Sequence, residues 1–335
     1  MTTSGRATLA QIAHEAGVST STVSRALRGR GEMAAPTRAR ILAAARRLGY
    51  AREDEPRGRP RTGTARLFDL VLGHYHDPYT DEVTAGAHQA AAELGYDLVL
   101  TAESDDPGDD WPIRVRGRGS AGVVLGLIRP TLSQLTVLRD AGIPIVLMEP
   151  PSEASVELTS VRTTDRAGAA EAAAHLIERG CTRFIVVAGA PAYRYGRARV
   201  EGFTRTVEEL LPGAPLMRVQ AGWEAVQARQ AVLPALRSLP GSGPVGLFAC
   251  SDEMAAGAYR SIAELGLRVP ADVRVVGFDD VRGARYLQPG LTTVRQPIRE
   301  MASAAVRALV DPDLPIGSVI ELPTTLVIRG STHAG

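Results

Sequence analysis

Residues 17–27 read GVSTSTVSRAL, and this stretch determines how the first fifty residues fold. Gly17 permits a tight turn between two helices, and Ser19 can cap the helix that follows. Val18 and Val23 are spaced to face inward, whereas the polar side chains around them project outward. The pattern predicts a helix-turn-helix whose second helix is exposed.

The neighbouring segments supply the other two helices of such a unit. Thr8 and Gln11 fit a capping box at the start of a first helix. A third helix begins near Pro36, which is acceptable in a first helical turn, and ends at Gly49. Three small amphipathic helices without a role in nucleic-acid binding are the alternative.

Charge is divided unevenly along the chain and argues against that alternative. Residues 1–66 contain 13 Arg and 5 acidic residues, a net charge of +8, and the remainder carries −7 within a total of +1. A basic head binds DNA phosphates with release of counterions, and an acidic body does not compete for the same surface. The distribution favours DNA as the partner of the head.

Length and composition bound the rest of the molecule. With 335 residues, 44% of them hydrophobic and 22% charged, the chain is long enough for a small head and two globular lobes. No apolar run reaches membrane-spanning length, and the N-terminus lacks the apolar core of a signal peptide. Cys181 and Cys250 are too few for a disulfide framework. We therefore expect a cytoplasmic protein without a membrane partner.

From residue 66 onward, short β-rich runs alternate with Ala-rich helical runs. The expected strands cover residues 66–72, 97–101, 122–127, 144–148, 182–187, 244–249 and 273–277. Such repetition predicts parallel sheets covered by helices on both faces, an α/β core. Ligands of these folds bind at the carboxyl ends of the strands. The sequence places Glu149, Ser251 and Asp279 at such ends.

A head signature and six further motifs give the whole chain a resemblance to the LacI/GalR family of transcription repressors. The head signature combines TLAQIA at 8–13 with GVSxxTVSR at 17–25. The further motifs are LGY at 48–50, RxxGF at 199–203, SDxMA at 251–255, VGFDD at 276–280, LTTVxQP at 291–297 and LVIRGS at 326–331. Jointly and in this order, the motifs are highly specific.

The resemblance implies the domain organisation. We expect a small all-α helix-turn-helix head, followed by an α/β core of two lobes that is similar to periplasmic binding proteins, with parallel sheets and three chain crossings. The implied boundaries are a head at 1–52, a hinge at 53–65, a first lobe at 66–160 with 292–320, and a second lobe at 161–291 with 321–331. One head reads a half-site only, so a homodimer on double-stranded operator DNA is expected.

The head residues expected to contact DNA follow from the same resemblance. Thr20, Ser21 and Arg25 occupy positions that read base edges in the major groove, and Arg25 can make a bidentate contact to guanine. The full set expected in the head is Thr8, Ser19, Thr20, Ser21, Thr22 and Arg25.

The hinge departs from the family pattern. Members usually have a short helix that pushes a Leu into the minor groove, but Pro60 stands at that position and Pro56 further disfavours a helix. The sequence PRGRP at 56–60 resembles an AT-hook, in which Arg57 and Arg59 lie in a narrow A·T minor groove. A basic linker that contacts only phosphates is an equally weighted alternative.

The resemblance also implies a cleft for a sugar or sugar derivative between the lobes. Asp279 and Arg199 match positions that contact ligand hydroxyls, while Trp223 and Tyr79 match aromatic positions in the cleft. A buried structural pair is the alternative for the two charged residues, and a place in the core is the alternative for the aromatic ones. Ser251 and Glu149 stand where the family commonly has Asn and Asp, so a different effector is expected.

Motifs for catalysis or cofactor binding fail on inspection. GRGSAG at 117–122 precedes an apolar strand, whereas a dinucleotide-binding loop follows one. His74, His76 and Asp77 lack a further cluster that would complete a metal site, and neither cysteine has a Cys-His context. The sequence predicts a transcription regulator, most simply a repressor, that is not an enzyme and needs no cofactor or metal. A solute-binding receptor without a DNA role is the alternative.

Overall fold

The computed structural model describes residues 8–27, 34–48, 66–103, 110–152 and 158–333. The chain divides into two compact units, Met1–Arg59 and Pro60–Gly335. The hinge at 53–65, with Arg57 and Arg59 and the expected AT-hook, lies outside the described residues.

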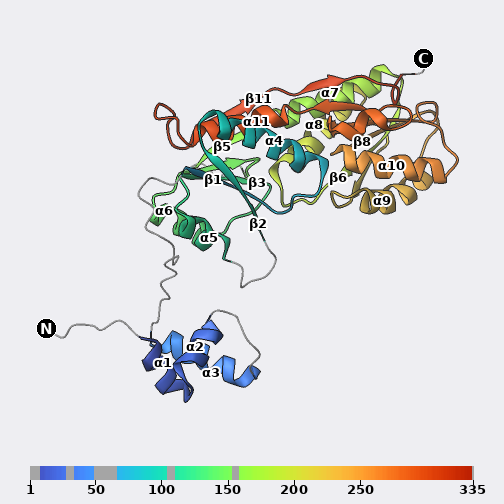
Figure 1. Ribbon diagram of the computed structural model, residues 1–335. Coiled ribbons are helices and arrows are strands. Elements are labelled where there is room, and N and C mark those ends of the chain that lie inside the picture. Colours follow the sequence, from blue (N-terminus) through green and yellow to red (C-terminus); the bar gives the residue numbers. More distant parts are fainter. Residues whose placement is uncertain (1–7, 28–33, 49–65, 104–109, 153–157, 334–335) are drawn as a thin grey trace. The chain divides into compact units, whose positions relative to one another are not determined.

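The first unit contains the three predicted helices, α1 (Leu9–Ala16), α2 (Thr20–Leu27) and α3 (Ala35–Arg47), drawn in blue in Figure 1. The capping box forms, because Thr8 Oγ1 accepts a hydrogen bond from the Gln11 amide (3.3 Å) and Gln11 Oε1 accepts one from the Thr8 amide (2.7 Å). Gly17 ends α1 in the left-handed region, at φ +65°. The fully buried side chains at the centre of the unit are Ile12, Val23, Ile41 and Ala44. The helix-turn-helix prediction is confirmed.

The second unit contains two six-stranded sheets. The first sheet consists of β1 (Leu67–Leu72), β2 (Asp97–Ala102), β3 (Gly122–Gly126), β4 (Ile145–Met148), β5 (Thr159–Thr163) and β11 (Val319–Leu322). The second sheet consists of β6 (Arg183–Ala188), β7 (Leu216–Gln220), β8 (Val245–Ala249), β9 (Val273–Asp279), β10 (Thr292–Arg295) and β12 (Thr325–Val327). The strand orders are β11-β5-β4-β3-β1-β2 and β12-β10-β9-β8-β6-β7, and only the pairing of β12 with β10 is antiparallel.

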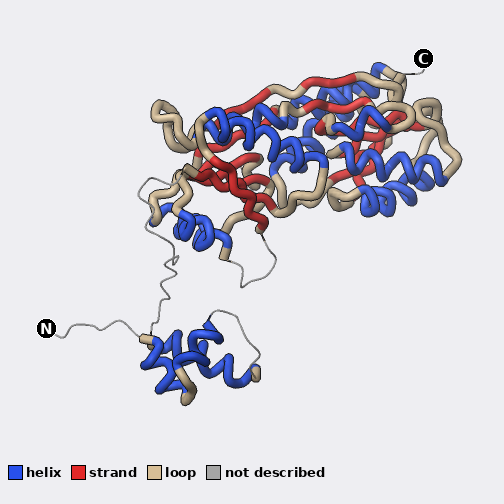
Figure 2. Tube along the Cα trace, viewed as in Figure 1, coloured by secondary structure: helices blue, strands red, loops and turns tan. Residues whose placement is uncertain are grey.

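Helices cover both sheets, as Figure 2 shows in blue around the red strands. The first lobe comprises the first sheet with α4 (Pro78–Glu93), α5 (Trp111–Arg118), α6 (Leu132–Asp140) and α11 (Ile298–Ala308). The second lobe comprises the second sheet with α7 (Asp165–Glu178), α8 (Arg194–Leu210), α9 (Ala225–Ser238), α10 (Asp252–Glu264) and the short 3₁₀ helix η1 (Arg282–Tyr286). In β1, Phe68, Leu70 and Leu72 pack towards α4 and α11 and Val71 towards α5, as the two-residue period of a strand requires. The α/β prediction is confirmed.

The chain crosses between the sheets three times, after β5, after β10 and after β11. The crossings lie a few residues from the predicted lobe boundaries. Residues 161–163 belong to the first sheet because β5 pairs with β4, and residues 321–322 follow them through the pairing of β11 with β5. Residues 292–295 belong to the second sheet because β10 pairs with β9 and β12. Hydrogen bonding between strands thus corrects the expected ranges.

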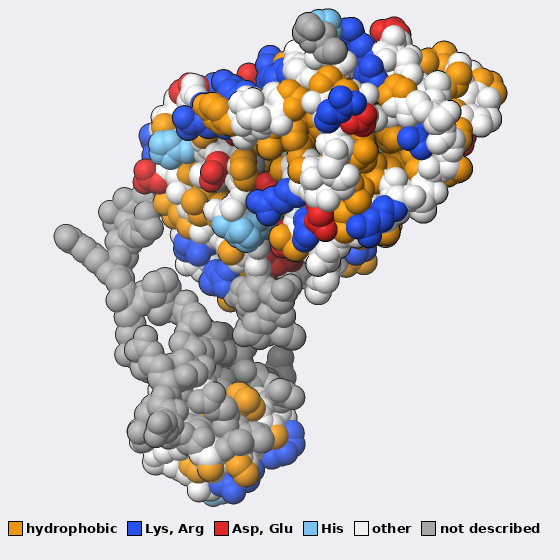
Figure 3. Space-filling view, turned by 90° about the vertical axis from the view of Figure 1, so that its right-hand side faces the viewer, with side chains coloured by type: hydrophobic (Ala, Val, Ile, Leu, Met, Phe, Trp, Pro, Cys, Tyr) orange, Lys and Arg blue, Asp and Glu red, His pale blue; other side chains and the backbone are white. Residues whose placement is uncertain are grey.

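The outer surface gives no simple charge signal. On the face of the molecule drawn in Figure 3, cationic, acidic and apolar side chains of the core are interspersed. No helix within the described ranges is long and apolar enough to cross a membrane.

Candidate functional site

A cavity of about 860 Å³ is lined by residues of both lobes, and we call it the cleft. Six residues predicted to contact an effector all line it, namely Tyr79, Glu149, Arg199, Trp223, Ser251 and Asp279. They come from six separate segments, and four of them lie at the end of a strand or the start of a helix. The structure brings the predicted residues together, and their contact with an effector stays a prediction.

Backbone strain is concentrated at the cleft. Among the described residues, four other than glycine have a positive φ, and three of these line the cleft: Leu127 (57°), Glu149 (53°) and Asp279 (114°). Each lies at the end of a central strand. Such conformations cost of order 1–3 kcal/mol each and are commonly retained at ligand sites. The strain supports a binding role for these strand ends.

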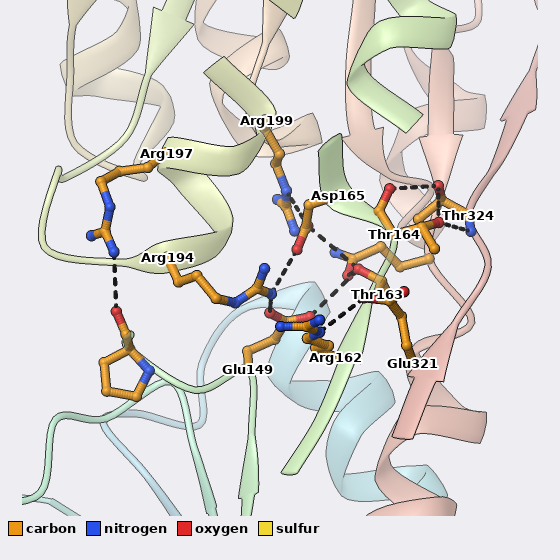
Figure 4. A network of polar contacts seen from close by, with 12 residues as sticks. Glu149, Arg162, Thr163, Thr164, Asp165, Arg194, Arg197, Arg199, Glu321 and Thr324 are labelled. Atoms are coloured by element: carbon orange, nitrogen blue, oxygen red, sulfur yellow. Dashed lines mark hydrogen bonds and ion pairs between the residues drawn. The ribbon is translucent and has the colours of Figure 1, made fainter. Parts of the chain in front are cut away.

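Buried charges connect the two lobes behind the cleft (Figure 4). Arg194 on α8 donates through Nη2 to Glu149 of the first lobe and to Asp165 at the start of α7, at 2.8 Å each. All three side chains are at most 6% exposed. Glu149 is therefore the point at which the first lobe joins the charged network of the second.

Arg199 extends this network to Asp279. Its Nε donates to Asp165 (2.9 Å), and its Nη1 donates to the Cys250 carbonyl (2.8 Å) and to Asp279 (3.3 Å). The Arg199 guanidinium also lies 3.8 Å from the centre of the Phe278 ring. These contacts hold Arg199 rigidly at the floor of the cleft.

Two uncharged side chains, Thr163 and Gln296, extend the same network to the segments where the chain crosses between the lobes. Thr163 Oγ1 at the end of β5 donates to Gln296 Oε1 (3.0 Å), and Gln296 Nε2 donates to Asp279 (2.6 Å). Gln296 follows β10, so two of the three chain crossings are linked to a residue of the cleft. Asp279 is thus bonded, through Gln296, to both of these segments.

The pKa values of two cleft carboxyls are raised. Burial, followed by the negative charge of Asp165, raises the pKa of Glu149 to about 8. Burial also raises the pKa of Asp279 to about 7, against the opposing effect of Arg199. Burial alone would lower the pKa of Arg199, but Asp165, Asp279 and Glu149 raise it, so this side chain stays charged. Near neutral pH the cleft can therefore hold a protonated carboxyl as well as carboxylates.

Aromatic side chains form one wall of the cleft. The Trp223 ring lies 5.2 Å from the Tyr195 ring and 6.4 Å from the Tyr193 ring, between ring centres. The indole is seated on two glycines: a Cβ at Gly189 would lie 2.3 Å from Trp223 Cζ2, and one at Gly196 would lie 3.1 Å from Cη2. The wall offers flat apolar faces of the kind that pack against sugar rings.

Two aromatic side chains also offer polar atoms. Trp223 Nε1 and Tyr79 Oη are buried, and neither has a hydrogen-bond partner in the part of the chain that the structure describes. A buried donor without a partner is unfavourable. Both residues line the cleft, and each keeps one buried donor without a partner among the described residues.

Ser251 has a second role besides lining the cleft. Its Oγ accepts a hydrogen bond from the Met254 amide (3.2 Å) and so caps α10. The adjacent Asp252 accepts from Thr293 Oγ1 (2.5 Å) and from the Val281 amide (2.9 Å). Asp252 thereby holds the loop that follows Asp279, which makes it a positioning residue.

Among the described residues, the histidines at the cleft have too few neighbouring ligands for a metal site. His74 pairs with Asp77, and the His74 and His76 rings are 4.5 Å apart. Within the described ranges, no three His, Cys, Asp or Glu side chains are grouped as metal ligands.

The structure orients part of the predicted DNA surface. Thr8, Ser19, Thr20 and Ser21 are exposed, and Thr22 is partly buried. Ser19 Oγ accepts from the Thr22 amide (3.2 Å), so Ser19 caps α2 as predicted. Arg25 lies on α2, and its side chain is outside the described part of the structure. DNA contact by these residues stays a prediction.

Four residues of the site were not predicted from the sequence, namely Asp165, Arg194, Tyr195 and Gln296. A weak signal existed for Tyr195, which lies four residues before Arg199 and therefore on the same helix face. Arg194 and Asp165 carry no such signal, because their partner Glu149 lies in the other lobe.

Comparisons with known proteins agree with this architecture. The family model "Bacterial regulatory proteins, lacI family" matches residues 8–53, and the "Periplasmic binding protein-like domain" matches residues 173–332. The chain is 34% identical to the HTH-type transcriptional regulator MalR of Streptomyces coelicolor, over 97% of this chain and 96% of that protein.

Two solved structures are similar along nearly the whole chain. A complex of the transcriptional regulator CelR with cellobiose has a TM-score of 0.70 and 26% identity, and it covers 97% of this chain and 100% of that one. The lac repressor dimer bound to operator and the anti-inducer ONPF has a TM-score of 0.71 and 24% identity, with 98% and 100% covered. The second likeness concerns the fold alone.

Proposed function

The chain belongs to the lacI family of bacterial regulatory proteins, and we propose that it represses transcription by binding operator DNA as a homodimer under the control of a small carbohydrate. The head binds the operator, and the carbohydrate binds in the cleft between the lobes. Such a protein acts in the cytoplasm, where the DNA is.

One observation carries the proposal for the cleft. Six residues predicted from the sequence as effector contacts line one cavity, and both lobes contribute to it. The cavity combines an aromatic wall at Trp223, acceptors at Asp279 and Glu149, and donors at Arg199 and Tyr79. A polyhydroxylated ring satisfies all of these groups at once, because each hydroxyl both donates and accepts. The cellobiose bound to the relative CelR supports the same ligand class.

The head supports the DNA-binding half of the proposal. In α2, Thr20 and Ser21 are exposed at the helix start, where recognition helices contact base edges. A second copy of the chain supplies the second head that a two-part operator requires.

Coupling between the two functions runs through the lobes. An effector that binds Asp279 and Arg199 meets the network that joins Arg194 to Glu149 across the lobes. Operator affinity changes only if the effector has different affinities for two arrangements of the lobes. The network offers such a difference, because its bonds depend on where the lobes lie.

A gel-shift experiment tests the proposal. The full-length protein is titrated onto the DNA upstream of its own gene and onto random DNA of equal length, with and without a panel of monosaccharides and disaccharides. We expect preferential binding of the upstream DNA and a change of affinity with at least one sugar. Equal binding of both DNAs would refute the operator role, and no response to any sugar would refute the effector role.

A further inference from the structure

We propose that the cleft selects its effector by charge: it accepts sugars that are neutral or carry an amino group, and it excludes sugar phosphates and sugar acids. The inference rests on the proposed function, since it concerns the ligand of the same cleft. It is carried by the balance of charges around the cavity.

Both guanidinium groups of the buried network behind the cleft are already bonded to carboxyl groups. Three carboxyl groups, on Glu149, Asp165 and Asp279, face two guanidinium groups, on Arg194 and Arg199. All five side chains are less than a tenth exposed. The network therefore offers an anionic ligand no free cation, and a buried anion without a partner is unfavourable.

Further carboxylates stand at the cleft itself. The acidic residues that line it are Asp77, Glu103, Glu149, Glu224, Glu253 and Asp279. Two of these, Glu224 and Glu253, are exposed and make no hydrogen bond or ion pair with the described residues. Glu224 precedes α9, and Glu253 lies in the first turn of α10, where a helix favours acidic side chains. Their position at the cavity adds to its negative potential.

Positive charge at the cleft is scarce and already engaged. Arg199 is the only Arg among the lining residues that the structure describes, and it is bonded to Asp165 and Asp279. His74 is paired with Asp77, which leaves His76 beside it. A phosphate or carboxylate group would therefore meet carboxylates without gaining a free cation. Like charges brought together in this way strongly disfavour binding.

An amino group would meet the opposite situation. The rings of Trp223 and Tyr193 present faces that attract cations, and the free carboxylates of Glu224 and Glu253 border the same cavity. Ammonium groups bind at such combinations of aromatic faces and carboxylates. A neutral sugar lacks this gain but suffers no repulsion.

The potential of the cleft can be measured without knowing the ligand, because Trp223 lies in it. The other tryptophan, Trp111, is 1% exposed and silent towards quenchers. We expect iodide to quench the fluorescence of the full-length protein less than caesium does, relative to free tryptophan at the same ionic strength. Glu224→Gln combined with Glu253→Gln should raise quenching by iodide about twofold. Glu208→Gln, an exposed change on α8 away from the cleft, is the matched control.

Three sugars of one shape test selection directly. Cellobiose, the corresponding β-1,4 dimer of glucosamine and cellobiouronic acid, which keeps both rings and carries a carboxylate in place of one C6 hydroxymethyl group, are compared by titration calorimetry at one salt concentration. We expect the acid to bind at least about tenfold more weakly than cellobiose, a difference of about 1.4 kcal/mol, and the amino dimer at least as tightly. Equal or tighter binding of the acid would overturn the proposal. If none of the three disaccharides binds, the quenching result alone tests the charge proposal. Equal quenching by iodide and caesium that does not change in the double variant would refute it. The missing response to sugars would count against the effector role instead.

Discussion

Arg194 in the second lobe and Glu149 in the first are joined by a buried ion pair, with Nη2 of Arg194 2.8 Å from a carboxylate oxygen of Glu149. The same nitrogen atom bonds Asp165, so one guanidinium contacts carboxyl groups on both sides of the lobe boundary. The relative placement of the lobes is thus coupled to a residue that lines the cleft.

Arg194→Met should destabilise the core unit strongly. Removal of the guanidinium leaves Glu149 buried without a cation and leaves Asp165 with Arg199 alone, and losses of about 3–5 kcal/mol are typical when one partner of a buried pair is removed. Urea unfolding of the variant measures the loss. Arg205→Met is the matched control, because Arg205 forms an exposed pair with Glu209 on the same helix and should cost less than about 1 kcal/mol. Equal losses in the two variants would mean that the pair across the lobes is not structural.

The stability of the core should fall as the pH rises from 5 to 9. Folding raises the pKa of Glu149 from 4.5 to about 8 and that of Asp279 from 3.8 to about 7, so the folded state holds protons that the unfolded state releases. The stabilisation is complete below the unfolded values and is lost as the pH passes through the folded ones. Melting curves of the parent and of Glu149→Gln measure this slope. The variant should have a flatter slope, and an unchanged slope would contradict the assignment.

Asp279→Asn should abolish the sugar response without weakening operator binding. Asp279 lines the cleft and lies in a different compact unit from α2. Operator affinity without sugar should therefore stay within about fivefold of the parent. The change of operator affinity caused by sugar, about 5–150-fold in typical allosteric proteins, should vanish. Titration of operator affinity against sugar, together with a melting curve, distinguishes this from a structural role. A structural role would lower the melting temperature and both activities together.

Arg25→Lys should reduce discrimination between operator and random DNA. Lysine keeps the positive charge but cannot form the two parallel bonds to guanine that arginine can, and each such contact contributes about 1–3 kcal/mol of discrimination. Competition binding at fixed salt measures the ratio of the two affinities. Random-DNA binding should change little, and an unchanged ratio would exclude Arg25 from base recognition.

Replacement of Arg57 and Arg59 by Ala separates the two interpretations of the hinge. An AT-hook predicts a larger loss of affinity for operators with an A·T-rich centre, because arginine favours a narrow minor groove. A linker that contacts phosphates predicts equal losses for A·T-rich and G·C-rich centres. The two operators are compared side by side at one salt concentration, and a uniform loss would rule out the AT-hook.

Local signals made the head and the central strands predictable. Gly17, Ser19 and the capping box at Thr8 act within a few residues, and the strands from β1 to β4 are short apolar runs. The strand β5 was missed because its sequence TSVRT is largely polar, although it lies between two neighbours in the sheet. The strand β7 was missed because it is an edge strand with exposed side chains. Pairing partners far away in the sequence determine such elements.

The candidate site divides in the same way. Asp279, Glu149 and Ser251 could be predicted because each lies at the carboxyl end of a strand, where ligands of parallel α/β sheets bind. Arg194 could not, because its partner Glu149 lies in the other lobe, and Gln296 could not, because it meets Asp279 only through the pairing of β10 with β9.

The seat of the Trp223 indole on Gly189 and Gly196 constrains how relatives of this protein can evolve. Any side chain at Gly189 would occupy the space of the indole, so even a change to alanine displaces the whole ring. The carboxylates of Glu224 and Glu253, by contrast, are exposed and can be exchanged one at a time at little cost to stability. A relative that evolves to bind a different sugar can therefore change Glu224 and Glu253 one at a time. The aromatic wall, by contrast, can be kept or lost only as a whole, because Trp223 and its two glycines depend on one another.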